Sequence, residues 1–97
     1  MDRTKINGYL SIARKGGNVI LGSDNLKGYT KKLYLILIDK NAGKNAMKIA
    51  ENLAKEKEIE ITQIENLPEI LGQINCKVCG IKNKNLSEII FNLIKEK

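Results

Sequence analysis

Few residues in this chain could perform catalysis, and the clearest candidates are two cysteines. Cys76 and Cys79 have the C-x-x-C spacing found in thiol redox centres and in half of a zinc site. Zinc needs four ligands, and the sequence holds no second cysteine pair and no histidine to complete them. The pair also enters a predicted strand, so alternation puts the two thiols on opposite faces. We therefore expect buried, reduced and metal-free cysteines.

A second candidate is the segment 41–45, which partly resembles a phosphate-binding loop. Gly43 precedes Lys44, but the earlier glycine and the hydroxyl residue that would hold magnesium are missing. The segment is more simply a turn leading into a helix. The chain also has no histidine, the commonest general base. We therefore expect a protein that is not an enzyme and has no cofactor.

Length and charge limit the remaining possibilities. The 97 residues make one domain, 1–97, and 17 Lys and Arg against 11 Asp and Glu give a net charge of +6. This surplus favours an anionic partner, nucleic acid first, but a lysine-rich solvated surface explains it equally well. No apolar run reaches membrane-spanning length, and the first residues do not resemble a signal peptide. We expect a cytoplasmic protein without membrane contact.

The elements that would position a site are organised around an unbroken apolar run at 32–39. A short run without polar alternation predicts a central strand covered on both faces. Asn41, Gly43 and Asn45 then supply turn and cap residues. A helix ending near Lys57 follows, since apolar residues recur with helical spacing at Ala46, Met47, Ile49, Ala50 and Leu53.

The other segments complete an alternating order of helices and strands. A first helix ends at Arg14 and Lys15 before two glycines, and a short strand covers 19–21. Ser23 and Asp24 are cap candidates for a helix of about two turns at most. Residues 58–64 alternate as a strand near an edge. A short helix over 66–71 capped by Asn66, a strand over 77–81 and a helix capped by Asn85 follow. The predicted order is αβαβαβαβα around one sheet.

Three stretches carry a resemblance to a known family. They are residues 8–22 (GYLSIARKGGNVILG), residues 31–39 (KKLYLILID), and Leu71-Gly72 ahead of the last strand. The chain resembles the kink-turn RNA-binding ribosomal proteins of the large-subunit "L-seven-Ae" type, and is most similar to their small bacterial ribosome-associated paralogues. The likeness covers nearly the whole chain. It implies an α/β fold, a three-layer αβα sandwich around a mixed four-stranded sheet.

The resemblance also implies where RNA would bind. The family reads the RNA kink with a Gly-x-Asn-Glu pattern at the second helix, and here Asp24 and Asn25 stand at the Asn and Glu positions. Aspartate lacks the amide donors of asparagine and repels phosphate. Pro68 replaces a basic residue in the second contact loop, and the second helix is about one turn shorter than the family's. The implied RNA-binding residues are Arg14, Lys15, Gly22, Ser23, Asp24, Asn25, Lys27, Lys31, Lys32, Asn66, Leu71 and Gly72.

Three functions remain open from the sequence. The first is a non-enzymatic RNA-binding protein, ribosome-associated, with structured RNA and ribonucleoprotein components as partners. The second is a protein-interaction module on the same scaffold whose RNA binding is weakened or lost. The third, an enzyme, has no set of residues to support it, and fold similarity alone does not decide between the others.

Overall fold

The computed structural model describes residues 3–72 and 76–95, and its elements follow the predicted order. They are α1 (Arg3–Lys15), β1 (Val19–Leu21), α2 (Ser23–Gly28), β2 (Leu35–Asp39), α3 (Lys44–Lys57), β3 (Glu60–Ile64), α4 (Leu67–Leu71), β4 (Val78–Ile81) and α5 (Lys84–Lys95). No helix within these ranges is both long and apolar enough to cross a membrane.

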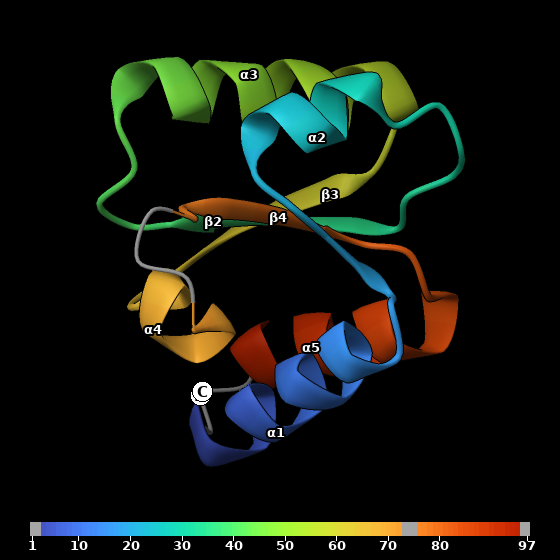
Figure 1. The fold of residues 1–97 in the computed structure, drawn as a ribbon, viewed down its shortest axis with the longest axis vertical. Coiled ribbons are helices and arrows are strands. Elements are labelled where there is room, and N and C mark those ends of the chain that lie inside the picture. Colours follow the sequence, from blue (N-terminus) through green and yellow to red (C-terminus); the bar gives the residue numbers. More distant parts are fainter. Residues whose placement is uncertain (1–2, 73–75, 96–97) are drawn as a thin grey trace.

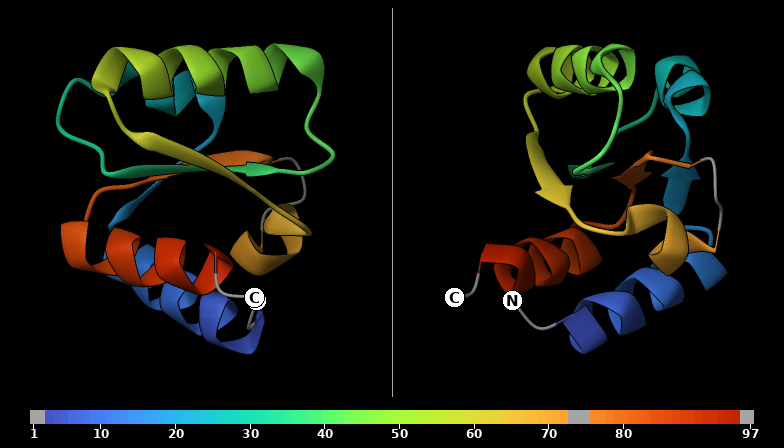
Figure 2. Two further views of the ribbon diagram at one scale, coloured as in Figure 1. Left: turned by 180° about the vertical axis from the view of Figure 1, so that it is seen from behind. Right: turned by 90° about the vertical axis from the view of Figure 1, so that its left-hand side faces the viewer.

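The strands form one mixed sheet in the order β1-β4-β2-β3. β2 runs parallel to β3 and antiparallel to β4, which also pairs antiparallel with β1. Helices α1, α4 and α5 cover one face, and α2 and α3 cover the other (Figures 1 and 2). The predicted αβα sandwich is thus confirmed, with β2 inside the sheet and β3 at an edge.

The alternation of β2 divides the core into two clusters. All five residues of β2 are buried. Leu35 and Leu37 pack with residues of α1, α4 and α5, whereas Ile36 and Ile38 pack with residues of α2 and α3. A strand without polar alternation is therefore covered on both faces, as its sequence predicts.

Helix α2 is seated on the sheet at Gly80 of β4. A Cβ atom added to Gly80 would lie 2.6 Å from Leu26 Cδ2 and 3.2 Å from Leu33 Cδ2, and both leucines are fully buried. Only glycine permits this close approach of helix and strand. The position of α2 therefore depends on a leucine packed against bare backbone.

The starts of α2, α3 and α5 differ from the predicted caps. Gly22, with φ of 86°, is the N-cap residue of α2, so Ser23 and Asp24 lie inside the helix and cap nothing. Asn45 likewise lies inside α3, whose N-cap residue is Gly43. Asn83 caps α5 in place of Asn85, because its Oδ1 accepts a hydrogen bond of 3.0 Å from the Leu86 amide.

Asn66 does occupy the N-cap position of α4, but its side chain makes no cap hydrogen bond. The carboxylate of Asp39 at the end of β2 replaces it, accepting from the Leu67 amide at 3.0 Å. Its other oxygen accepts from the Asn41 amide at 3.0 Å. This buried charge is thus satisfied by backbone donors, as burial requires.

The prediction that the two thiols lie on opposite faces is wrong. Cys76 and Cys79 are both free and buried, and both belong to the cluster under α1, α4 and α5. Cys76 precedes β4, so strand alternation does not govern its direction. Burial, and next the neighbouring Cys76, raise the pKa of the Cys79 thiol far above its usual range. Such a thiol is a poor nucleophile.

Candidate nucleic-acid interface

The start of α2 brings together the polar residues that follow β1. Antiparallel pairing with β4 fixes the place, since the Gly22 amide donates to the Val78 carbonyl at 2.9 Å. The next residues are half-buried Ser23 and exposed Asp24 and Asn25. The Asn25 side-chain amide donates to the Leu21 carbonyl at 2.7 Å, so this side chain turns back toward β1.

Lys77, which is not among the residues predicted from the sequence, precedes the Val78 carbonyl that bonds to Gly22. The register Leu21↔Cys79, continued by one step, pairs Gly22 with Val78, so Lys77, the residue before Val78, lies at the same end of the sheet as the first turn of α2. On its other side, the Lys77 carbonyl accepts from the Asp39 amide at 2.7 Å, and its Nζ donates to the Asn41 carbonyl at 3.4 Å. Only the pairing of β4 between β1 and β2 could have revealed this cation, because sequence distance hides it.

Three other predicted residues meet in a contact within the protein. The Arg14 guanidinium at the end of α1 donates to the Leu71 carbonyl at the end of α4. A Cβ on Gly72, whose φ is 69°, would approach Arg14 Nη1 to 3.2 Å. The Leu71 side chain is buried in the core. This group fastens two helices together, while Arg14 remains exposed to solvent.

The remaining predicted basic residues are spread apart. Lys15, Lys31 and Lys32 lie at the opposite end of the sheet from Gly22, where β1 and β2 begin. Lys27 lines a hollow between α2 and α3, together with Glu56. The twelve implied residues therefore do not form one continuous surface.

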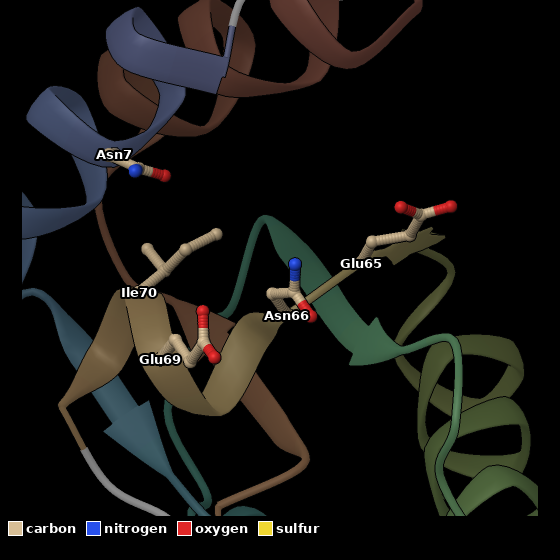
Figure 3. A pocket seen from close by; sticks show the side chains of 5 residues that line it. All are labelled: Asn7, Glu65, Asn66, Glu69 and Ile70. Atoms are coloured by element: carbon tan, nitrogen blue, oxygen red, sulfur yellow. The ribbon is translucent and has the colours of Figure 1, made fainter.

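Asn66 lies in a separate pocket of about 250 Å³, beyond the end of edge strand β3 (Figure 3). Asn7 of α1, Ile70 of α4 and the carboxylates of Glu65 and Glu69 line it as well. Lys40 pairs with Glu65 at 3.3 Å. Two carboxylates make this pocket unfavourable for phosphate.

The chemistry of the α2 start is that of recognition. It offers a hydroxyl, an amide and a carboxylate, and exposed Lys77, whose ammonium donates to the Asn41 carbonyl, adds a positive charge at the same end of the sheet. Within the described ranges, no three or more Cys, Asp or Glu residues gather closely enough to hold a metal ion. Recognition of a polar, anionic surface is the activity that such residues can support.

Comparisons with known proteins support the fold and give no information on function. No protein-family model and no curated protein matches the chain. Among solved structures, a protein of unknown function from Bacillus halodurans superimposes with a TM-score of 0.82 at 20% sequence identity. The match covers 95% of this chain and 98% of that one. At this identity the likeness shows that the two chains share one fold, a sandwich of helices around a mixed sheet.

Proposed function

We propose that the protein is a non-enzymatic, ribosome-associated RNA-binding protein that recognises a kink-turn or a similarly structured RNA at the start of α2. The observation that carries the proposal is the strand pairing that puts the polar first turn of α2 beside Lys77. Hydrogen-bonding groups and a basic residue from segments far apart in sequence thus lie at the same end of the sheet. The net charge of +6 adds long-range attraction for a polyanion.

Each group has a distinct part in this proposal. The Lys77 ammonium would neutralise a phosphate, and Ser23 and Asn25 would bond to base edges or sugars of an irregular RNA. Asp24 opposes binding, because its exposed carboxylate meets negative charge. We therefore expect moderate affinity for RNA, and we expect that removing the charge of Asp24 increases it.

The test is a fluorescence titration with a kink-turn hairpin and a matched hairpin whose kink is mutated, each at two salt concentrations. We expect tighter binding to the kinked RNA. Lys77→Gln should weaken that binding and lower the salt slope by about one, whereas Lys48→Gln on α3 should have a smaller effect. Equal binding to both hairpins would contradict kink recognition.

The alternative function, a protein-interaction module on the same scaffold, is favoured by one observation. Ile12 on α1 is 59% exposed and Ile89 on α5 is 37% exposed, so two large aliphatic side chains on this face of the domain are open to a protein partner. Weak binding to both hairpins that vanishes with moderate salt would favour this alternative. The Ile12 side of the domain would then be the surface to examine.

A further inference from the structure

A groove of about 420 Å³ follows the outer edge of β1. Its lining residues are Val19, Ile20, Leu21, Asn25, Gly28 and Tyr29. Asn25 belongs to the first turn of α2, and Tyr29 follows the last residue of that helix. The groove therefore leads from the proposed RNA site toward the opposite end of the sheet, over about 10 Å of strand. None of these described lining residues is acidic.

A cation and an aromatic ring are held together at the far end of this groove. Lys82 Nζ lies 5.7 Å from the centroid of the Tyr29 ring. It also donates to the Gly17 carbonyl at 3.2 Å, and the Lys82 amide donates to the Asn18 carbonyl at 2.7 Å. These contacts limit the positions that the ammonium can take. Single-stranded nucleic acid binds in grooves that combine positive charge with aromatic side chains on which bases stack.

Further lysines enlarge the positive charge at this end. Lys31 and Lys32 follow Tyr29 in the loop before β2, and the Lys57 ammonium donates to the Lys31 carbonyl at 3.2 Å. The nearby carboxylates of Glu60 and Glu88 lie on the α5 side, where they line a hollow with Tyr34. Lys32 Nζ lies 5.3 Å from the centroid of the Tyr34 ring, on the side of these acids, whereas Lys82 lies beside Tyr29 at the groove.

We infer that the β1 groove holds a single-stranded RNA segment that continues from the structured RNA at α2. A phosphate would pair with Lys82, and a base would pack against the Tyr29 ring and the apolar residues of the groove. This inference rests on the proposed RNA-binding function and adds a second contact to it. Apolar walls with cations at one end suit unpaired nucleotides, whose bases are free to leave the stack.

The test compares a blunt kinked hairpin with the same hairpin carrying a six-nucleotide uridine tail, at the 5′ or the 3′ end in separate RNAs. For one of the two tails we expect about tenfold tighter binding than for the blunt RNA. Lys82→Gln should remove most of this gain and reduce the salt slope on tailed RNA by about one. Tyr29→Leu should also remove most of it. Binding of the blunt hairpin should stay unchanged in both variants.

Matched variants separate binding from folding. Lys82→Arg keeps the charge and Tyr29→Phe keeps the ring, so both should retain the tail effect, and thermal melts should show every variant folded. A tail that adds nothing, or variants that weaken blunt and tailed RNA equally, would overturn the inference. Failure of the proposed function would give a different result, because kinked and mutated-kink hairpins would then bind equally.

Discussion

The two faces of the sheet are covered in different ways. On one face α1, α4 and α5 enclose a core that holds both thiols, and Arg14 fastens α1 to α4. On the other face, α2 has six residues and a single fully buried side chain, Leu26, which rests on Gly80. The proposed site is on the lightly held helix, so its geometry depends on very few contacts, and each prediction below tests this difference.

A cavity made on either face of β2 should lower the free energy of unfolding by a similar amount, but the two cavities should differ in their effect on RNA binding. Leu35→Ala and Ile36→Ala should each lower the free energy of unfolding by about 2 to 5 kcal/mol, because both side chains are fully buried in β2. Only Ile36→Ala, on the α2 side, should also weaken RNA binding under conditions where the protein stays folded. Denaturant titration and hairpin binding measure the two effects. Equal losses of affinity would remove the distinction between the faces.

Gly80→Ala tests the seat of α2 directly. The added methyl would overlap Leu26, so we expect a loss of about 1 to 3 kcal/mol in unfolding free energy and a loss of hairpin affinity. Gly8→Ala, at an exposed position of helix α1, is the control, since nothing lies within 4 Å of the added carbon. That change should stabilise the protein by about 0.5 to 1 kcal/mol. A neutral Gly80→Ala would mean that α2 adjusts without cost.

Asp24→Asn should strengthen kink-turn binding by about 1 to 2 kcal/mol, because it removes like charge and adds a donor. Stability should change by at most about 0.5 kcal/mol, since Asp24 caps nothing and only its favourable charge at the helix start is lost.

Lys27→Ala should weaken binding and lower the salt slope by about one. Hairpin titrations at two salt concentrations measure both. Unchanged affinity in two folded variants would direct attention to the protein-interaction alternative.

The buried thiol of Cys79, on the face covered by α1, α4 and α5, should make the free energy of unfolding depend on pH. Its pKa is raised by burial, so the folded state keeps a proton that the unfolded chain releases above about pH 8.5. Its stabilising contribution is therefore complete below that pH and is lost as pH rises, by about 1 kcal/mol between pH 8.5 and 9.5. Denaturant midpoints of reduced protein, compared with Cys79→Val, measure it. Parallel curves for the two proteins would show that the thiol stays protonated in both states.

Local patterns predicted the element order because each segment carries its own periodicity. The apolar run of β2, the alternation of β3 and the glycines after α1 and α4 all act within a few residues. The caps were less predictable, since a competing partner can come from elsewhere. Asn66 was expected to cap α4 with its side chain, but the hydrogen bond at this helix start runs from the Leu67 amide to Asp39. At α2 the N-cap residue is Gly22, whose positive φ favours glycine.

The candidate site was harder to derive because its parts are joined by long-range pairing. Ser23, Asp24 and Asn25 are adjacent in sequence, but Lys77 joins them only through the β1 and β4 ladder. Arg14 was expected at phosphate, and its guanidinium instead reaches the Leu71 carbonyl. Whether a basic side chain faces RNA or backbone depends on which carbonyls lie near it, and residue type alone does not show that.

The position of β4 between β1 and β2 also has a consequence for synthesis. The β2, α3 and β3 segments are consecutive and can assemble early, but β1 pairs with a strand that emerges nearly sixty residues later. Until Val78 leaves the ribosome, the Gly22 amide lacks the carbonyl that fixes it. Nascent chains should therefore complete the α2 start only after β4 has emerged, so a chain cut short before β4 would lack the finished form of the proposed site.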